Sequence, residues 1–233
     1  MLISLGQRVL DLFYPPHCVL CLRATARGEH LCGGCLRSAP RIEEPACPVC
    51  SCPAGGTCVD CRTRRLAFDC AVTRYRSEGV VREVIHRFKY RHHYHLRHPL
   101  AAWLRECLED SRLLSPPPDA LVPVPLHPLR ERERGFNQAR ALAQRLSRGT
   151  GLPVRDALRR IRHTPSQTRL DRALRMENLR NAFELRHNTP VRNQHLLLID
   201  DVLTTGSTVH ECARVLRKAG AAASVRVVTV ARG

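Results

Sequence analysis

The apolar residues near the C-terminus fall into three blocks with two different spacings. An almost unbroken apolar run covers residues 195–199, as expected of a strand that is buried on both faces. From about Ser207 to Ala219 the apolar residues instead recur every three or four positions, which indicates an amphipathic helix that ends at Gly220. A second apolar run covers residues 225–230. These blocks predict a strand–helix–strand unit, the building block of a parallel sheet.

The same two spacings recur toward the N-terminus. Apolar stretches at 68–75 and 121–125 predict further strands, and helical spacing over 80–88 and 136–146 predicts one helix after each of them. A short amphipathic helix is expected over residues 2–13, before Pro15 and Pro16. The alternation of strands and helices predicts an α/β fold with a parallel sheet.

Two stretches interrupt this alternation. Ser115 to Asp119 contains three consecutive prolines, which favour extended chain and predict a connector. Residues 162–180 are too polar and charged to belong to a core and begin with a turn signal. We expect this second stretch to leave the sheet.

The chain is strongly basic. Its 38 lysines and arginines against 21 acidic residues give a formal charge of +17, which attracts polyanions such as nucleic acids, nucleotides or pyrophosphates without distinguishing among them. Aromatic residues make up only 4% of the chain, so a surface that stacks many single-stranded bases is not evident.

The N-terminal sequence and the lengths of the apolar runs indicate where in the cell the protein is expected. No apolar run approaches the roughly 20 residues that a membrane-spanning helix needs. The first residues also lack the basic start and cleavage site of a secretory signal. We therefore expect a cytoplasmic protein that is not integral to a membrane.

Cysteines concentrate in the N-terminal quarter, where nine of the twelve lie between Cys18 and Cys61. Eight of these nine cysteines form four Cys-x-x-Cys pairs. A pair of this kind places two thiolates on one tetrahedral metal, and four pairs therefore predict two structural Zn²⁺ sites that supply folding free energy. Consecutive use of the pairs and interleaved use both fit the spacing, and Cys52 is left over. Disulfides are disfavoured by the missing signal peptide. The eight candidate ligands are Cys18, Cys21, Cys32, Cys35, Cys47, Cys50, Cys58 and Cys61.

The segment LLLIDDVLTTGST combines two carboxylates with a hydroxyl-rich turn. Asp200 and Asp201 stand where the buried strand ends, and the following helix start offers unpaired N–H groups to a phosphate. Gly206 allows close approach of the backbone. Ribose hydroxyls, a bound Mg²⁺ or both are the expected partners of the carboxylates. The hydroxyls available to the phosphate belong to Thr204, Thr205, Ser207 and Thr208.

The string IDDVLTTGST closely resembles the ribose-phosphate signature of type I phosphoribosyltransferases. Residues 121–138 and 164–183, with the cysteine array, are similar to the ComF family of amidophosphoribosyltransferase-like competence proteins over essentially the entire chain. The resemblance implies a Rossmann-like phosphoribosyltransferase domain over residues 67–233. A double zinc-ribbon-like module would precede it in residues 1–66, and the implied process is DNA uptake during natural transformation.

The resemblance also implies roles for individual residues. Asp200 and Asp201 would take the ribose hydroxyls, and Thr204 to Thr208 the 5′-phosphate, of phosphoribosyl pyrophosphate bound with Mg²⁺. The pyrophosphate loop would fall near residues 126–135, where Arg132 and Arg134 are candidates to stabilise charge as the glycosidic bond breaks. The polar segment from Thr164 to Arg180 corresponds in position to the hood that closes over the ligand.

Two functions are compatible with these features. The first is transfer of a phosphoribosyl group to an acceptor that the sequence does not identify, and no general base is evident for it. The second is a non-catalytic competence factor that binds single-stranded DNA, meets the DNA-uptake machinery and retains the phosphoribosyl site for sensing or structure. Resemblance of fold alone does not carry a reaction across.

Overall fold

A computed structural model describes residues 15–90, 93–163 and 178–233 of the chain. The helix expected over residues 2–13 lies outside the described residues, as does most of the polar segment from Thr164 to Arg180.

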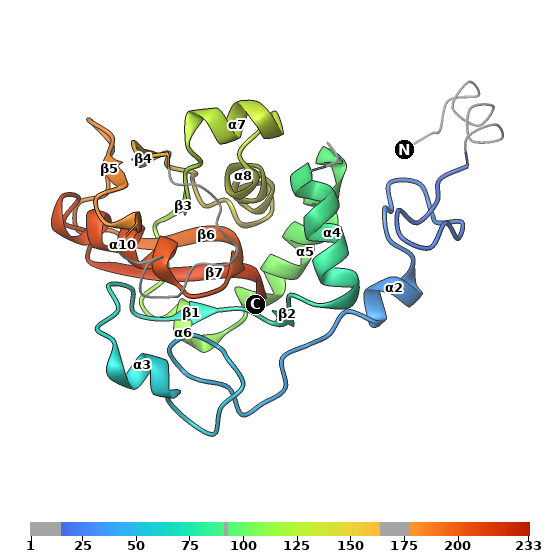
Figure 1. The fold of residues 1–233 in the computed structure, drawn as a ribbon, viewed down its shortest axis with the longest axis horizontal. Helices are drawn as coiled ribbons and strands as arrows, with labels where there is room; N and C mark the ends of the chain where they lie inside the picture. Colours follow the sequence, from blue (N-terminus) through green and yellow to red (C-terminus); the bar gives the residue numbers. More distant parts are fainter. Residues whose placement is uncertain (1–14, 91–92, 164–177) are drawn as a thin grey trace.

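Five parallel strands form the sheet at the centre of the molecule (Figure 1). The long strands β6 (His195–Leu203) and β7 (Ser224–Arg232) pair in register, with Ile199 opposite Val228. β3 (Ala120–Pro123) adds to the free side of β6, while β1 (Ala71–Val72) and β2 (Tyr75–Arg76) both pair with β7. The α/β fold with a parallel sheet is confirmed.

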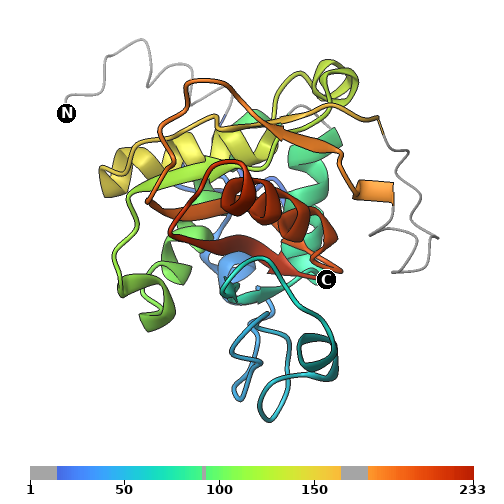
Figure 2. The same cartoon turned by 90° about the vertical axis from the view of Figure 1, so that its left-hand side faces the viewer.

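Helices cover both faces of this sheet, and Figure 2 shows α8 and α10 separated by the strands. Successive residues of β6 alternate between two cores: Leu197 and Ile199 belong to the core on one face, and Leu196 and Leu198 to the core on the other. The first core includes α4 (Gly79–Tyr90), η1 (Tyr94–Leu96), α5 (Arg97–Cys107), α6 (Ser111–Leu114) and α8 (Gln138–Thr150), and the second core includes α10 (Ser207–Lys218). The periodicity of residues 80–88, 136–146 and 207–219 therefore predicted real helices.

Two short antiparallel strands, β4 (Leu158–Arg160) and β5 (Phe183–Leu185), flank the polar segment. Leu158 pairs with Leu185 in a sheet separate from the main one. The described residues on either side of the polar segment therefore lie outside the parallel sheet, while the prediction for the segment itself falls mostly on residues that are not described.

Two local expectations differ from the structure. The strand expected over residues 68–75 is interrupted between β1 and β2, where the carbonyl of Arg74 accepts a hydrogen bond from Ile42 rather than from a neighbouring strand. The expected loop at residues 126–135 contains a helix, α7 (Pro128–Arg134). His127 caps its start and Gly135 ends it in the left-handed region at φ 79°, so local capping substitutes for the apolar periodicity that the segment lacks.

The cysteine-rich N-terminal part packs against both faces of the sheet. Cys18 and Leu31 belong to the core that contains α4 and α5, whereas Cys47 and Cys50 belong to the core that contains α10. Residues 18–35, which carry the first four of these cysteines, are called the first ribbon, and residues 47–61 the second ribbon. Figure 1 accordingly shows the first ribbon, with α2 (Gly33–Arg37), beside α4, and the second ribbon, with α3 (Val59–Thr63), below β1. The domain boundary at residue 66 stays a prediction.

Among the described residues, the structure has no helix whose length and apolar character would allow it to cross a membrane.

Candidate ligand-binding site

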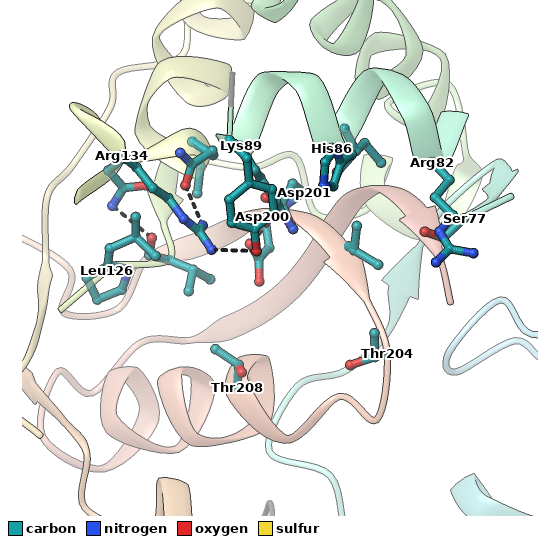
Figure 3. A pocket seen from close by; sticks show the side chains of 18 of the residues that line it. Ser77, Arg82, His86, Lys89, Leu126, Arg134, Asp200, Asp201, Thr204 and Thr208 are labelled. Carbon is teal, nitrogen blue, oxygen red and sulfur yellow. Dashed lines mark hydrogen bonds and ion pairs between the residues drawn. The ribbon is translucent and has the colours of Figure 1, made fainter. Parts of the chain in front are cut away.

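A cavity of about 790 Å³ opens at the carboxyl ends of β3 and β6, where parallel sheets bind their ligands. Pockets for small ligands and cofactors commonly have volumes of about 300–1,000 Å³. Helix α4 forms one wall, and the start of α10 lies opposite it (Figure 3). Its lining includes the polar and charged side chains of Arg82, His86, Lys89, Tyr90, Arg134, Asn137, Arg160, Asp200, Asp201, Thr204 and Thr208.

The two predicted carboxylates lie at the centre of this cavity. Asp201 is only 6% exposed, and its Oδ1 is 2.7 Å from Nζ of Lys89, which projects from α4. The backbone N–H of Asp201 donates to Oδ1 of Asp200 at 2.8 Å. Burial and the adjacent Asp201 carboxylate raise the pKa of Asp200 to about 7, against the lowering effect of Lys89. Asp200 therefore titrates near neutral pH.

The predicted phosphate turn joins β6 to α10. Gly206 adopts the left-handed conformation at φ 74°, which favours glycine. Thr205 and Ser207 share a hydrogen bond of 2.9 Å between their hydroxyls, and Ser207 is buried. Thr204 and Thr208 line the main cavity, where a ligand can reach their side chains. The hydroxyls of Thr205 and Ser207 instead bond to each other within the turn.

Basic side chains occupy the other end of the cavity. Arg134 donates to Gln138 Oε1 at 2.9 Å and to the Tyr90 hydroxyl at 3.2 Å, with its guanidinium 5.0 Å from the Tyr90 ring centre. The positive charges of Lys89 and Arg134, both labelled in Figure 3, each lower the pKa of Asp200. Arg132 lies exposed on α7 and is not among the residues that line the described cavity, so its role stays a prediction.

Sequence reasoning did not assign the basic face of α4 to this site. Arg82, His86 and Lys89 recur at helical spacing opposite the apolar face, and all three line the cavity. It also missed Asn137, a buried residue whose Nδ2 donates to the Val124 carbonyl at 3.1 Å and whose Oδ1 caps α8. The repeat of basic residues at positions 82, 86 and 89 was the available signal.

The eight predicted zinc ligands form two groups of four. Of the two arrangements that the spacing left open, the structure has consecutive use of the pairs, because Cys18, Cys21, Cys32 and Cys35 gather in one group and Cys47, Cys50, Cys58 and Cys61 in the other. The Sγ atoms of three neighbouring pairs lie 3.5–3.7 Å apart. A tetrahedral site with Zn–S bonds of about 2.3 Å has S–S separations of about 3.8 Å, whereas a disulfide has about 2.05 Å.

These donor sets therefore fit closed, structural Zn²⁺ sites. Cys52 belongs to neither group of four among the described residues.

A histidine cluster links the first ribbon to the region after α4. The ring centre of His30 lies 4.5 Å from that of His95 and 5.8 Å from that of His98. Burial and the neighbouring cationic groups lower the pKa of His95 to about 4. The rings of His30, His95 and His98 are half-buried, and His95 is neutral at neutral pH.

Comparisons with known proteins agree with this architecture. A family model described as "Double zinc ribbon domain" matches residues 9–71, and one described as "Phosphoribosyl transferase domain" matches residues 132–233. The chain is 38% identical over 143 residues to competence protein F of Haemophilus influenzae, which covers 59% of this chain and 62% of that protein.

Two further relatives align over most of their length. DNA utilization protein YhgH of Escherichia coli K12 is 36% identical over 216 residues, covering 90% of this chain and 94% of that protein. Competence protein ComFC of Bacillus subtilis is 31% identical over 216 residues, covering 88% and 85%. With its double zinc ribbon and phosphoribosyltransferase domain, the chain belongs to the ComF family of competence proteins.

Proposed function

We propose that the cavity binds phosphoribosyl pyrophosphate together with Mg²⁺. The observation that carries this proposal is the order of charges along the cavity: the N-terminal start of α10, then Asp200 and Asp201, then Lys89 and Arg134. Such an order matches a ligand with a phosphate at one end, a diol in the middle and a pyrophosphate at the other end.

The donor atoms also suit the metal. The carboxylates of Asp200 and Asp201 offer the oxygen ligands that Mg²⁺ prefers, together with the pyrophosphate oxygens of the ligand, while Thr204 and Thr208 lie at the 5′-phosphate end. When bound, the ion would supply positive charge to the pyrophosphate. Lys89 would then contact the ligand as well as Asp201.

If the site is catalytic, the bond between C1 of the ribose and the pyrophosphate oxygen breaks, and the acceptor's nucleophile forms the new bond to C1. The leaving pyrophosphate gains charge, which Arg134 and Lys89 are placed to stabilise. The match of residues 132–233 to a phosphoribosyltransferase model supports the donor half of this reaction. The acceptor is left unassigned.

We further propose that this activity or binding serves DNA uptake on the cytoplasmic side of the membrane, as the names of the relatives, competence proteins and DNA utilization proteins, suggest. The alternative is a non-catalytic competence factor that binds single-stranded DNA and keeps the phosphoribosyl site for sensing or structure. The formal charge of +17 supports that alternative.

Isothermal titration of the zinc-loaded full chain tests the donor site. We expect saturable binding of phosphoribosyl pyrophosphate with Mg²⁺, competed by ribose 5-phosphate and by magnesium pyrophosphate separately. Absence of binding to well-folded protein would overturn the proposal. Affinity for single-stranded DNA that falls steeply with salt in such a protein would then favour the alternative.

The raised pKa of Asp200 predicts a pH dependence of binding. An ionised Asp200 is the form that accepts from hydroxyls or contacts a cation, so affinity should fall as the pH drops through about 7. With a midpoint near 7, the expected change between pH 8 and pH 6 is about tenfold. Lys89→Met removes a charge that lowers the pKa of Asp200, and its binding profile should shift to higher pH.

Titrations of wild type, Lys89→Met and Asp200→Asn at several pH values measure this effect. Phosphate groups of the ligand also titrate near pH 6, and Asp200→Asn isolates their contribution because it lacks the carboxyl group. If the affinity of wild type changed with pH by the same factor as the affinity of Asp200→Asn, the prediction would be contradicted.

A further inference from the structure

The segment that follows the second cysteine cluster reaches the predicted phosphate turn. Helix α3 carries Cys61 and ends at Thr63, and Nη1 of the next residue, Arg64, donates to the Thr205 carbonyl at 3.0 Å. A narrow crevice lies between the two segments, lined by Cys50, Cys61, Leu66 and Phe68 on one side and by Leu203 to Gly206 on the other. The turn is therefore supported from behind by the second ribbon.

Guanidinium groups engage three successive carbonyls of this turn. Arg64 binds the carbonyl of Thr205, while Nη1 of Arg232 donates to the carbonyls of Leu203 and Thr204 at 3.0 and 2.5 Å. A turn that holds a phosphate through its N–H groups needs its carbonyl oxygens directed elsewhere, because a carbonyl oxygen facing a phosphate dianion is repelled by it. The two arginines fix that orientation.

The first turn of α10 has a second tie to the same segment. The backbone N–H of Ala67 donates to Nδ1 of His210 at 3.1 Å. Phe68 lies directly under the turn, since a Cβ built on Gly206 would be 4.0 Å from Cζ of Phe68. Residues 64–68 thus follow the back of the turn from Thr205 to the beginning of α10.

A metal ion held by the second group of cysteines would order this segment. A helix of five residues such as α3 is not stable by itself, and the cysteines at its start and within it, Cys58 and Cys61, belong to the second group of four. Cys47 and Cys50 of the same group share a core with Leu203 beneath the turn. Occupancy of this group by Zn²⁺ would thereby set the position of Arg64.

We propose that Arg64 is a positioning residue through which the second zinc ribbon fixes the geometry of the 5′-phosphate turn, so that this ribbon governs affinity for the phosphate end of the ligand. The inference rests on the proposed function, because it concerns the phosphate subsite of that cavity. The first ribbon, which packs on the opposite face of the sheet, has no part in it.

The test compares Arg64→Met with Arg65→Met in the zinc-loaded full chain. Arg65 is the adjacent, exposed arginine and is the matched control for loss of one positive charge. The probes are ribose 5-phosphate, which needs the turn, and magnesium pyrophosphate, which needs the Lys89 and Arg134 end. We expect Arg64→Met to weaken ribose 5-phosphate about tenfold and to leave magnesium pyrophosphate unchanged, the loss expected for one positioning hydrogen bond.

The zinc content and a lysine variant complete the test. Arg64→Met should retain the zinc content of wild type, and Arg64→Lys, which keeps a charged donor, should recover part of the affinity even if the methionine variant proves unstable. Equal affinity of Arg64→Met and wild type for ribose 5-phosphate would overturn the positioning role while leaving the donor site intact. Failure of wild type to bind either probe would instead overturn the proposed function, and with it this inference.

Discussion

Replacing both Asp200 and Asp201 by asparagine is expected to abolish measurable binding of phosphoribosyl pyrophosphate with Mg²⁺. Each carboxylate would make a charge-assisted contact to the ribose hydroxyls or the cation, and such contacts contribute about 1.5–3 kcal/mol. Losing two of them corresponds to at least a 100-fold loss of affinity, at about 1.4 kcal/mol per tenfold. Isothermal titration of the double variant measures it directly.

The stability of the single variants separates loss of function from loss of fold. Asp200 ionises near pH 3.8 in the unfolded chain but has a pKa of about 7 in the folded protein, so stability falls as the pH rises through this range and the full penalty is present at pH 8. Asp200→Asn removes this penalty and should unfold at no lower temperature than wild type at pH 8. Asp201→Asn instead leaves Lys89 without its 2.7 Å partner and should be less stable.

Asp156→Asn is the matched control. Its ion pair with Arg140, at 2.8 Å, lies between two half-exposed side chains, and Asp156 is not among the residues that line the described cavity. This variant should bind the ligand as wild type does. Affinity of the double aspartate variant within about threefold of wild type would contradict the assignment of the carboxylates.

The C-terminal half of the fold was predictable because its signals are local. The apolar run of β6 and the amphipathic spacing of α10 each lie in one continuous segment, and the carboxylates and hydroxyls of the site adjoin them. Eight cysteines in Cys-x-x-Cys pairs likewise predict metal sites, because the spacing within each pair is local. Helix α7 was missed because its highly charged sequence has no apolar periodicity, and its capping residues decide its structure.

The cavity wall was not predictable because it depends on contacts between distant segments. Lys89 is a residue on the polar face of an ordinary amphipathic helix until the fold places it against Asp201. Arg64 is 141 positions from Thr205 in the sequence. Neither spacing nor composition relates such pairs, and the consecutive use of the cysteine pairs also required the folded arrangement.

Each zinc ribbon supports a different wall of the cavity. The first contacts α4, where Arg87 donates to the Val19 carbonyl between two ligands of the first group, and the same helix carries Lys89. The second supports the phosphate turn through Arg64. The cysteine-rich module is thus part of the site's scaffold rather than an independent appendage.

Removing two ligands from the second group, by Cys58→Ser and Cys61→Ser, is expected to destabilise the protein strongly. Structural zinc contributes about 10–16 kcal/mol to the folding of isolated zinc fingers. Here the core shared with β6 and α10 retains part of the packing, and we expect a loss of about 3–5 kcal/mol. For a chain of this size that corresponds to a fall in Tm of roughly 10 °C.

The double variant Cys21→Ser/Cys32→Ser is the matched control, since it removes two ligands from the first group. Both double variants should lose one of the two bound zinc ions, as measured by metal analysis. Only the second-group variant should also lose affinity for ribose 5-phosphate, because only that ribbon supports the turn that binds the phosphate. Equal affinities in the two variants would mean that the turn keeps its geometry without the second ribbon, and the scaffold role would then be limited to stability.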